Sequence, residues 1–117
     1  MAPNIDLVID CSDPERLAAF WAEALSYRKI GFREPYFLLR HEDASYPPLL
    51  LQRVPEPKDV KNRMHLDIRT EDVDGLASRL EGLGATRLSE HVEHGDRWIT
   101  MADPEGNEFC VCPGVPA

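Results

Sequence analysis

The chain has 117 residues and a mass of 13.3 kDa, enough for one domain or two half-size modules and too little for a multidomain enzyme. Hydrophobic residues make up 43% and charged residues 29%, which is typical of a globular protein rather than a disordered one. Twenty-one acidic residues against 13 basic ones give a net charge of -8. This charge repels a nucleic-acid backbone and an anionic membrane surface, so we expect neither as a partner.

The sequence also argues against export or membrane insertion. Its longest apolar run, residues 49–51, is far shorter than the roughly 20 residues of a spanning helix, and residues 1–6 lack the basic and apolar stretches of a signal peptide. The three cysteines, Cys11, Cys110 and Cys112, are an odd number and form no CxxC pair. We therefore expect reduced, buried thiols in a cytoplasmic protein.

A strand and a helix are predicted at the start of the chain. Residues 5–10 are rich in β-branched side chains and place Ile5, Leu7 and Ile9 on one face. The following segment, Ser-Asp-Pro-Glu, offers either a capping box from Ser12 to Glu15 or an Asp13 cap with proline at the first helical position. Apolar residues then recur at helical spacing up to about residue 25.

The second half repeats this pattern. Residues 64–69 alternate strictly, with Met64 on the apolar side, and residues 70–72 provide a cap for a helix that Gly84 would end. An offset of 59 positions aligns Asp13 with Asp72 and Asp6 with His65. A repeat of this length indicates a duplicated supersecondary unit.

Three short strands are predicted after each helix. They span residues 28–32, 35–40 and 48–54 in the first half and residues 86–92, 97–101 and 107–112 in the second. The prediction is an α+β fold in one domain, 1–117, with two βαβββ modules. Module one is 1–57, module two is 62–117, and a polar, proline-stiffened connector, 55–62, joins them.

Three segments carry a resemblance to a known family. They are VIDCSDPERLAAFWAEAL, VPEPK with NRMHLDI, and DPEGNEFCV, the last being the most specific. Together they resemble the vicinal oxygen chelate superfamily of glyoxalases, bleomycin-resistance proteins and extradiol dioxygenases, in its glyoxalase-like actinobacterial subgroup. The resemblance covers nearly the whole chain. It implies that the two modules form one curved mixed-sheet cup with the helices outside and the ligand on the concave face.

The resemblance also indicates where metal-using relatives place four ligands, one from the first and one from the last strand of each module. Here these positions are occupied by Asp6, Gln52, His65 and Cys110, with Gln52 matched to Cys110 by an offset of 58. Only His65 and Gln52 conform to the His, Glu or Gln usual there. Asp, His and a thiolate suit zinc, but the glutamine amide is a hard donor. No metal is favoured. Zinc, nickel, manganese and iron are the alternatives.

Strand alternation extends the predicted cup face to several further side chains. These are Asp10, Leu50, Val54, Asp67, Arg69, Glu108 and Cys112. Either the charged ones pair near strand ends in contact with water, or they bind a polar or cationic small molecule and transfer protons. Glu108, Asp6 and His65 are the acid/base candidates.

Trp98 is a candidate for lining the mouth of the predicted cup, whereas His91 and His94 are interpreted as solvated loop residues. The ligand-binding set is Asp6, Asp10, Gln52, His65, Asp67, Trp98, Glu108 and Cys110.

Three functions remain open at this point. The favoured one is a metal-free small-molecule binder of the antibiotic-sequestering type, because the acidic cup suits a cationic ligand. The alternative is a divalent-metal-dependent lyase, isomerase or oxygenase. The third is an accessory module with a vestigial cup. A homodimer is expected in each case, since exposed sheet edges gain burial by pairing.

Overall fold

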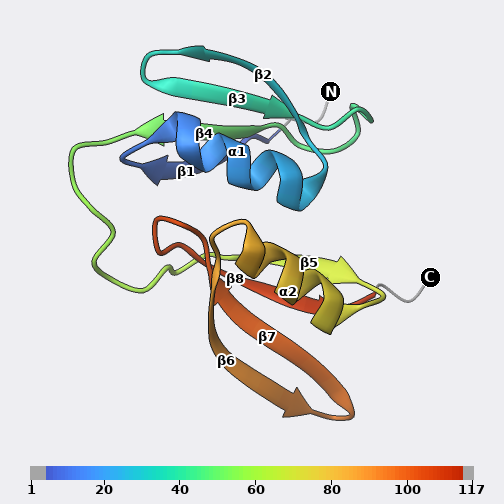
Figure 1. The fold of residues 1–117 in the computed structure, drawn as a ribbon. Helices are drawn as coiled ribbons and strands as arrows, with labels where there is room; N and C mark the ends of the chain where they lie inside the picture. The colour runs from blue at the N-terminus through green and yellow to red at the C-terminus, as the bar shows by residue number, and fades with distance from the viewer. Residues whose placement is uncertain (1–4, 115–117) are drawn as a thin grey trace. The chain divides into compact units, whose positions relative to one another are not determined.

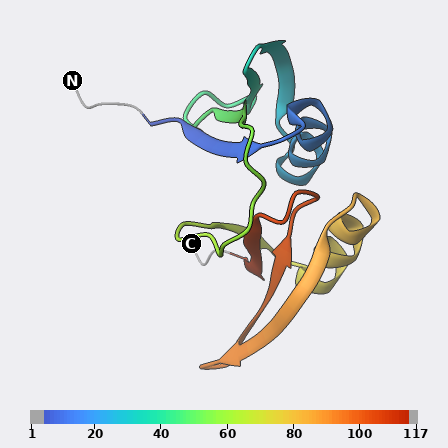
Figure 2. The same ribbon diagram turned by 90° about the vertical axis from the view of Figure 1, so that its left-hand side faces the viewer.

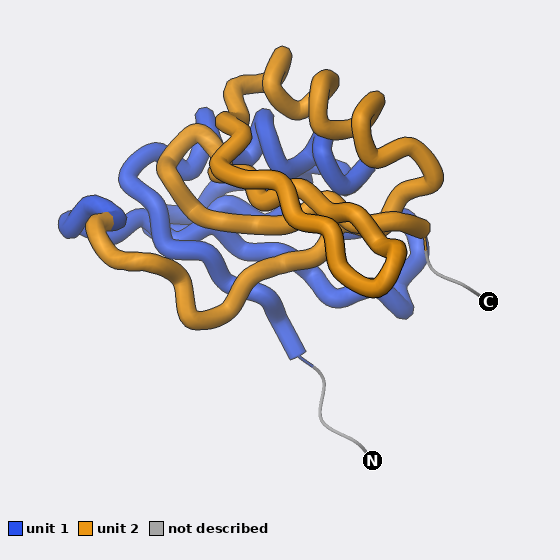
Figure 3. Tube along the Cα trace, turned by 90° about the horizontal axis from the view of Figure 1, so that it is seen from below, with its two compact units in different colours: residues 1–58 blue, residues 59–117 orange. Residues whose placement is uncertain are grey.

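The computed structural model describes residues 5–114, and the chain divides into two compact units. Unit 1 comprises residues 1–58 and unit 2 residues 59–117, drawn in separate colours in Figure 3. Each unit consists of a strand, a helix and three further strands in that order. The α+β class and the two βαβββ modules with mixed sheets are therefore confirmed. A cup shared by both modules stays a prediction.

Unit 1 is a four-stranded sheet with one helix against it. Its elements are β1 Leu7–Cys11, α1 Pro14–Leu25, β2 Arg28–Arg33, β3 Tyr36–Arg40 and β4 Leu49–Arg53. The strand order is β1-β4-β3-β2, with β1 parallel to β4 and the other pairs antiparallel. The helix contacts β2, β3 and β4 (Figure 1).

Unit 2 repeats the arrangement. Its elements are β5 Leu66–Thr70, α2 Val73–Gly82, β6 Thr86–Glu93, β7 Asp96–Ala102 and β8 Glu108–Pro113. The strand order is β5-β8-β7-β6, and again only the first pair, β5 with β8, is parallel. Figure 2 shows each helix against one face of its own sheet.

An aspartate caps each helix. The Asp13 carboxylate accepts a hydrogen bond from the Arg16 backbone N–H at 3.2 Å, with Pro14 as the first helical residue. The Asp72 carboxylate accepts one from the Gly75 N–H at 2.9 Å. Each such cap contributes about 1 kcal/mol. Of the two starts left open by the sequence, the structure has the Asp13 cap. Neither helix is long and apolar enough to cross a membrane within the part of the chain that the structure describes.

Each hydrophobic core lies between a helix and the facing side of its sheet. In unit 1, Leu17 and Trp21 of α1 meet strand residues that include Leu39, Leu49 and Leu51, all almost fully buried. In unit 2, Ala77 and Leu80 of α2 are buried, together with Ile99, Met101, Phe109 and Val111 of the strands. The opposite face of each sheet is thus left for other roles.

The first strand of each unit starts later than predicted. Pairing begins at Leu7 with Leu49 and at Leu66 with Phe109. Ile5 and Met64, which the alternation had placed on the apolar faces, precede the strands and are 66% and 83% exposed. They lie before the first paired residues, so the sheet does not hold their side chains over the core.

Strand pairing also corrects one equivalence between the modules. Val8 and Asp67 each lie five residues before the capping aspartate, and they pair with Leu50 and Cys110 respectively. Leu50 is therefore the counterpart of Cys110, and Gln52 is the counterpart of Cys112. A constant offset of 58 does not align the last strands of the two modules, because two connections differ in length. The β6–β7 hairpin is longer than the β2–β3 hairpin, whereas the loop at residues 41–48 is longer than its counterpart at 103–107.

Candidate functional site

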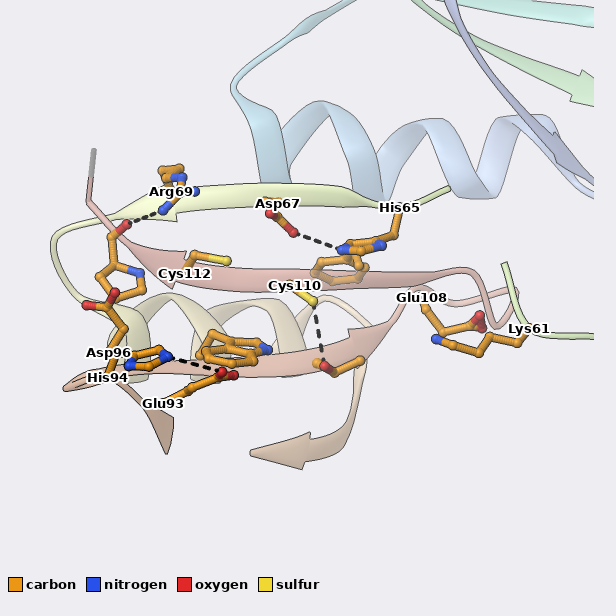
Figure 4. Close-up of a pocket in the computed structure, with 14 residues that line it drawn as sticks. Lys61, His65, Asp67, Arg69, Glu93, His94, Asp96, Glu108, Cys110 and Cys112 are labelled. Carbon is orange, nitrogen blue, oxygen red and sulfur yellow. Dashed lines mark hydrogen bonds and ion pairs between the residues drawn. The ribbon is translucent and has the colours of Figure 1, made fainter. Parts of the chain in front are cut away.

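A cavity of about 560 Å³ lies on the face of the unit 2 sheet opposite α2, and all the residues that line it fall between Lys61 and Pro113 (Figure 4). This volume is within the range of small-molecule sites in proteins. Residues of β5, β7 and β8 alternate between the two faces, so Phe109 and Val111 are buried in the core while Cys110 and Cys112 line the cavity.

The DPEGN turn positions β8 along one wall. Asp103, only 3% exposed, accepts hydrogen bonds from the backbone N–H groups of Glu105 and Asn107, both at 2.9 Å. Gly106 adopts φ +89°, a conformation that glycine takes at little cost. The turn delivers Glu108 to the start of β8, where its carboxylate accepts from the Asn62 N–H at 2.8 Å. This bond fixes the end of the connector beside the cavity.

Three potential metal-ligating side chains converge on one wall. The donor atoms of His65, Asp67 and Cys110 all lie within 4.8 Å of one another. His65 Nε2 is 3.1 Å from Asp67 Oδ1, and Asp67 is the direct strand partner of Cys110. His65 and Asp67 share a face because they are two residues apart where β5 begins. The parallel pairing of β5 with β8 then brings the thiol to them.

Two neighbours adjust the chemistry of this wall. Thr100 Oγ1 on β7 lies 3.6 Å from Cys110 Sγ, close enough for a weak hydrogen bond to sulfur. Cys112 lies two residues further along β8. Burial raises the pKa of the Cys112 thiol, and the nearby Asp67 carboxylate raises it further. Cys112 therefore stays protonated to higher pH than an exposed cysteine.

Trp98 of β7 forms an aromatic wall. Its ring stacks on His91 of β6, with centroids 5.2 Å apart and planes 18° from parallel. His91 Nε2 is in turn 2.8 Å from the Ser89 hydroxyl, which holds the imidazole in place. His91, which the sequence had suggested was a solvated loop residue, is thus a strand residue that supports the tryptophan.

The charges around the cavity are mainly negative. Among the described residues, only two permanently positive side chains line the cavity, those of Lys61 and Arg69. Four carboxylates line it, those of Asp67, Glu93, Asp96 and Glu108. Figure 4 shows Glu93 and Asp96 at one end, Glu108 with Lys61 at the other, and His65, Asp67 and Cys110 between them. Arg69 Nη1 donates a hydrogen bond to the Pro113 carbonyl oxygen, at 3.4 Å.

The structure brings together five of the residues chosen from the sequence, namely His65, Asp67, Trp98, Glu108 and Cys110. The other three belong to unit 1. Asp6 is exposed and precedes β1, while Asp10 and Gln52 are strand partners on β1 and β4. The proposed ligand set of Asp6, Gln52, His65 and Cys110 draws on both units and stays a prediction.

Several lining residues had escaped the sequence analysis. Glu93 and Asp96 flank a two-residue hairpin turn, His94-Gly95, in which both residues have positive φ, 52° and 81°. Glycine is favoured in such a two-residue turn because both turn residues take positive φ. That signal would have extended β6 and β7 to Glu93 and Asp96 and placed both carboxylates at the sheet end. His94 lines the cavity but its side chain is 88% exposed.

Comparison with known proteins identifies the family. Residues 6–112 match the model of the glyoxalase-like domain, so the chain belongs to that family, as the sequence motifs had suggested. No curated protein sequence matches the chain significantly.

Solved structures share the fold. A glyoxalase/bleomycin resistance protein/dioxygenase family enzyme from Burkholderia phytofirmans has a TM-score of 0.75 at 17% identity, with 95% of this chain and all of that one covered. Lactoylglutathione lyase from Agrobacterium tumefaciens gives 0.68 at 16% identity, over 97% and 95% of the two chains. A mutant of the fosfomycin resistance protein FosX from Listeria monocytogenes, complexed with Mn(II) and 1S,2S-dihydroxypropylphosphonic acid, gives 0.79 at 15% identity, over 98% and 93%.

The donor set of unit 2 fits a divalent metal of the zinc type. Imidazole, carboxylate and thiolate are the three ligand types that zinc takes in proteins. Manganese and magnesium prefer oxygen ligands, which here only Asp67 supplies within the three-residue cluster. These residues could therefore hold a soft or borderline ion more readily than a hard one.

Proposed function

We propose that the protein is a small-molecule-binding member of the glyoxalase/bleomycin-resistance type, which holds a polar or cationic organic ligand in the unit 2 cavity without needing a metal. The observation that supports this most is the excess of carboxylates around a cavity of small-molecule size. An organic cation would enter at the end bearing Glu93 and Asp96.

Trp98 supports the same ligand class. A cation over the face of a tryptophan gains about 0.5–2 kcal/mol, the larger value when water is excluded. The His91 ring stacks on Trp98, and Trp98 also lines the cavity. A cation that also carries an aromatic or aliphatic group would use both the charge and the apolar surface of the site.

Tryptophan fluorescence tests this proposal in the presence of a metal chelator. The probe is benzyltrimethylammonium, with benzenesulfonate as a comparison of similar size and opposite charge. Trp21 is 1% exposed in the core of unit 1 and serves as an internal reference, whereas Trp98 should respond. We expect saturable quenching by the cation alone, weakened by salt and lost in Trp98→Phe. Equal responses to both probes, or none, would contradict the proposal.

A second candidate function is a divalent-metal-dependent lyase, isomerase or oxygenase. The convergence of His65, Asp67 and Cys110 favours it. A bound ion would supply Lewis-acid polarisation of substrate oxygens. In this case Glu108 would accept or return a proton at its carboxylate, and His65 would orient the ion. Asp6 is the other acid/base candidate.

The metal content of the purified protein tests this second function. Stoichiometric zinc, nickel, manganese or iron is expected, and His65→Ala should abolish it. Protein that neither retains nor takes up any of these ions would rule the second function out.

We also propose that the protein forms a homodimer. One edge strand of the unit 2 sheet is β6, which is eight residues long and exposed throughout, with Leu88 and Val92 52% and 71% exposed. Long exposed edges with apolar side chains tend to pair with another chain. Light scattering at micromolar concentration should give twice the chain mass, and a monomer would contradict the proposal. A cytoplasmic location, without nucleic-acid or membrane partners, stays a prediction from composition.

A further inference from the structure

We infer that Arg97 is a positioning residue, whose ion pairs with Asp74 and Glu90 hold the outer part of the β6–β7 hairpin against α2 and thereby set the affinity of the unit 2 cavity for an organic cation. The inference rests on the organic-ligand site proposed above, and it gives a role to a side chain that lies outside the cavity lining. The outer part of the hairpin, residues 91–98, is called the hairpin arm below.

The hairpin arm extends beyond the rest of its sheet. Strand β7 pairs with β8 from Ile99 onward, whereas residues 96–98 pair with β6 only within the part of the chain that the structure describes. Figures 1 and 2 both show this end of β6 and β7 projecting away from β8. A two-stranded ribbon is marginally stable in water by itself, so the arm needs further contacts to keep one position.

The hairpin arm also carries one wall of the cavity. Glu93, His94, Asp96 and Trp98 all belong to it and line the cavity, while other lining residues lie on β5 and β8. The groups proposed to take the cationic ligand, two carboxylates and an indole ring, are therefore all on the arm. Their distance from β5 and β8 depends on where the arm lies.

Arg97 connects the arm to the helix. Strand alternation directs its side chain to the helix side of the sheet, while its neighbours Asp96 and Trp98 line the cavity. The guanidinium binds the Asp74 carboxylate in the first turn of α2 through two hydrogen bonds, at 2.8 and 3.0 Å, and pairs with Glu90 of β6. Two parallel bonds fix direction as well as distance. One side chain thus joins both strands of the hairpin to α2.

Apolar burial contributes little at this end of the hairpin. Val92, the strand partner of Arg97, is 71% exposed, whereas Ile99 at the base of the arm is 1% exposed. An exposed ion pair changes an equilibrium constant by a factor of only about 1.5 to 5. Such a factor matters little for global unfolding, but it shifts a local opening of low free energy. Because ligand affinity falls with the fraction of molecules in the binding conformation, Arg97 should affect affinity more than folding.

Two measurements without ligand test whether Arg97 holds the arm. Acrylamide quenching reports on Trp98, because Trp21 is 1% exposed. In Arg97→Gln, quenching should increase, and amide hydrogen exchange in residues 91–98 should accelerate by about 2- to 5-fold. Residues 99–102 should keep their protection. No acceleration would overturn the inference, and so would equal acceleration in both segments, since Arg97 would then stabilise unit 2 as a whole.

The direction of the change in ligand affinity separates positioning from simple electrostatics. Removing a positive charge near an acidic cavity should by itself strengthen the binding of a cation. Displacement of the arm should instead weaken the binding of benzyltrimethylammonium to Arg97→Gln, by about 2- to 5-fold. Isothermal titration calorimetry measures both affinities. Unchanged or tighter binding to the variant would overturn the inference.

Arg87→Gln is the matched control. Arg87 pairs with Glu81 of α2 at 3.0 Å, and its side chain is 34% exposed, as is that of Arg97, but it lies outside the arm. Its replacement removes the same charge and should not weaken cation binding. Arg97→Lys keeps the charge without the two-bond geometry, so its affinity should lie between those of wild type and Arg97→Gln. An equal loss in Arg87→Gln, or a lysine variant no better than the glutamine variant, would contradict the inference.

The inference and the proposed function fail in distinguishable ways. Absence of binding to wild-type protein overturns the organic-ligand site and with it the effect on affinity, whereas the measurements without ligand still decide whether Arg97 holds the arm. Binding to wild-type protein that Arg97→Gln does not weaken overturns the inference alone.

Discussion

The two units share one fold, but the sheet faces turned away from their helices differ in chemistry. Strand pairing matches three positions of unit 1 with the donor cluster of unit 2. In unit 1 these positions hold Asp6, Val8 and Leu50, and in unit 2 they hold His65, Asp67 and Cys110. The helix-side positions stay apolar in both units. The comparison shows that the helix-side face maintains the βαβββ fold, while the opposite face is free to acquire a site.

The helix-side faces are also held in different ways. The first helix, α1, buries six residues, Trp21 and Phe20 among them, whereas α2 buries only Ala77 and Leu80. Unit 2 also has an ion pair between its helix and its sheet. Arg97 of β7 binds the Asp74 carboxylate of α2 in bidentate fashion, at 2.8 and 3.0 Å, and also pairs with Glu90 of β6. Apolar burial is therefore more extensive at α1, and an ion pair supplements the smaller apolar contact at α2.

Replacing Trp21 should have the largest effect on stability. Trp21 is 1% exposed and packs edge-to-face on Phe20, with ring centroids 5.2 Å apart. Truncation of such a residue typically costs about 3–5 kcal/mol, so Trp21→Ala should lower the free energy of unfolding by that amount. Urea unfolding followed by far-ultraviolet circular dichroism measures it. A loss below about 1 kcal/mol would show that α1 is not held mainly by burial.

Acid should weaken the ion pairs that Arg97 makes in unit 2. The hydrogen bonds from Arg97 lower the pKa values of Asp74 and Glu90 in the folded protein. Both carboxylates then stabilise the fold above their unfolded pKa values of about 3.9 and 4.3, and this contribution is lost as the pH falls through the lower folded values. Because these groups are exposed, the loss should be smaller than that caused by Trp21→Ala.

Arg97→Gln provides the matched test of that pH dependence. It removes the cation while keeping a long polar side chain, so the fall in unfolding midpoint between about pH 5 and pH 2 should become shallower. Added salt should flatten the wild-type profile in the same direction. Identical profiles for wild type and Arg97→Gln would show that other carboxylates account for the acid sensitivity.

The fold could be predicted because its determinants are local. The capping aspartates, the helical stripe of α1 and the alternation at residues 64–69 each identify an element without knowledge of the rest. The strand starts were less accurate, because Ile5 and Met64 continue the alternation but lie before the first residues that pair with the parallel partner strand. Hydrophobic periodicity is a property of a single segment, whereas the length of a strand also depends on the neighbouring strand with which it pairs.

The site was only partly predictable for the same reason. Alternation placed His65, Asp67, Glu108 and Cys110 on one face, but it could not say which residue stands beside Cys110 on the neighbouring strand. That information depends on register, which loop lengths alter by one or two residues. Asp67 therefore entered the ligand-binding set and not the metal set. Glu93 and Asp96 became visible only once the His94-Gly95 turn was placed.

The smallest effect expected is that of Gln52→Ala on metal binding. This variant separates the four-ligand set expected from the resemblance from the three-residue cluster in unit 2. In the four-ligand set, the Gln52 amide oxygen bonds the ion directly, and its loss should weaken zinc binding by at least about 10-fold. In the unit 2 site, Gln52 is the counterpart of Cys112 and lies beside Asp10 on the unit 1 sheet, so zinc affinity should not change. Competition with a chromophoric chelator measures the affinity, with Cys110→Ser as the positive control. A 10-fold loss in Gln52→Ala would mean that the first module contributes to the ion site despite its apolar Val8 and Leu50.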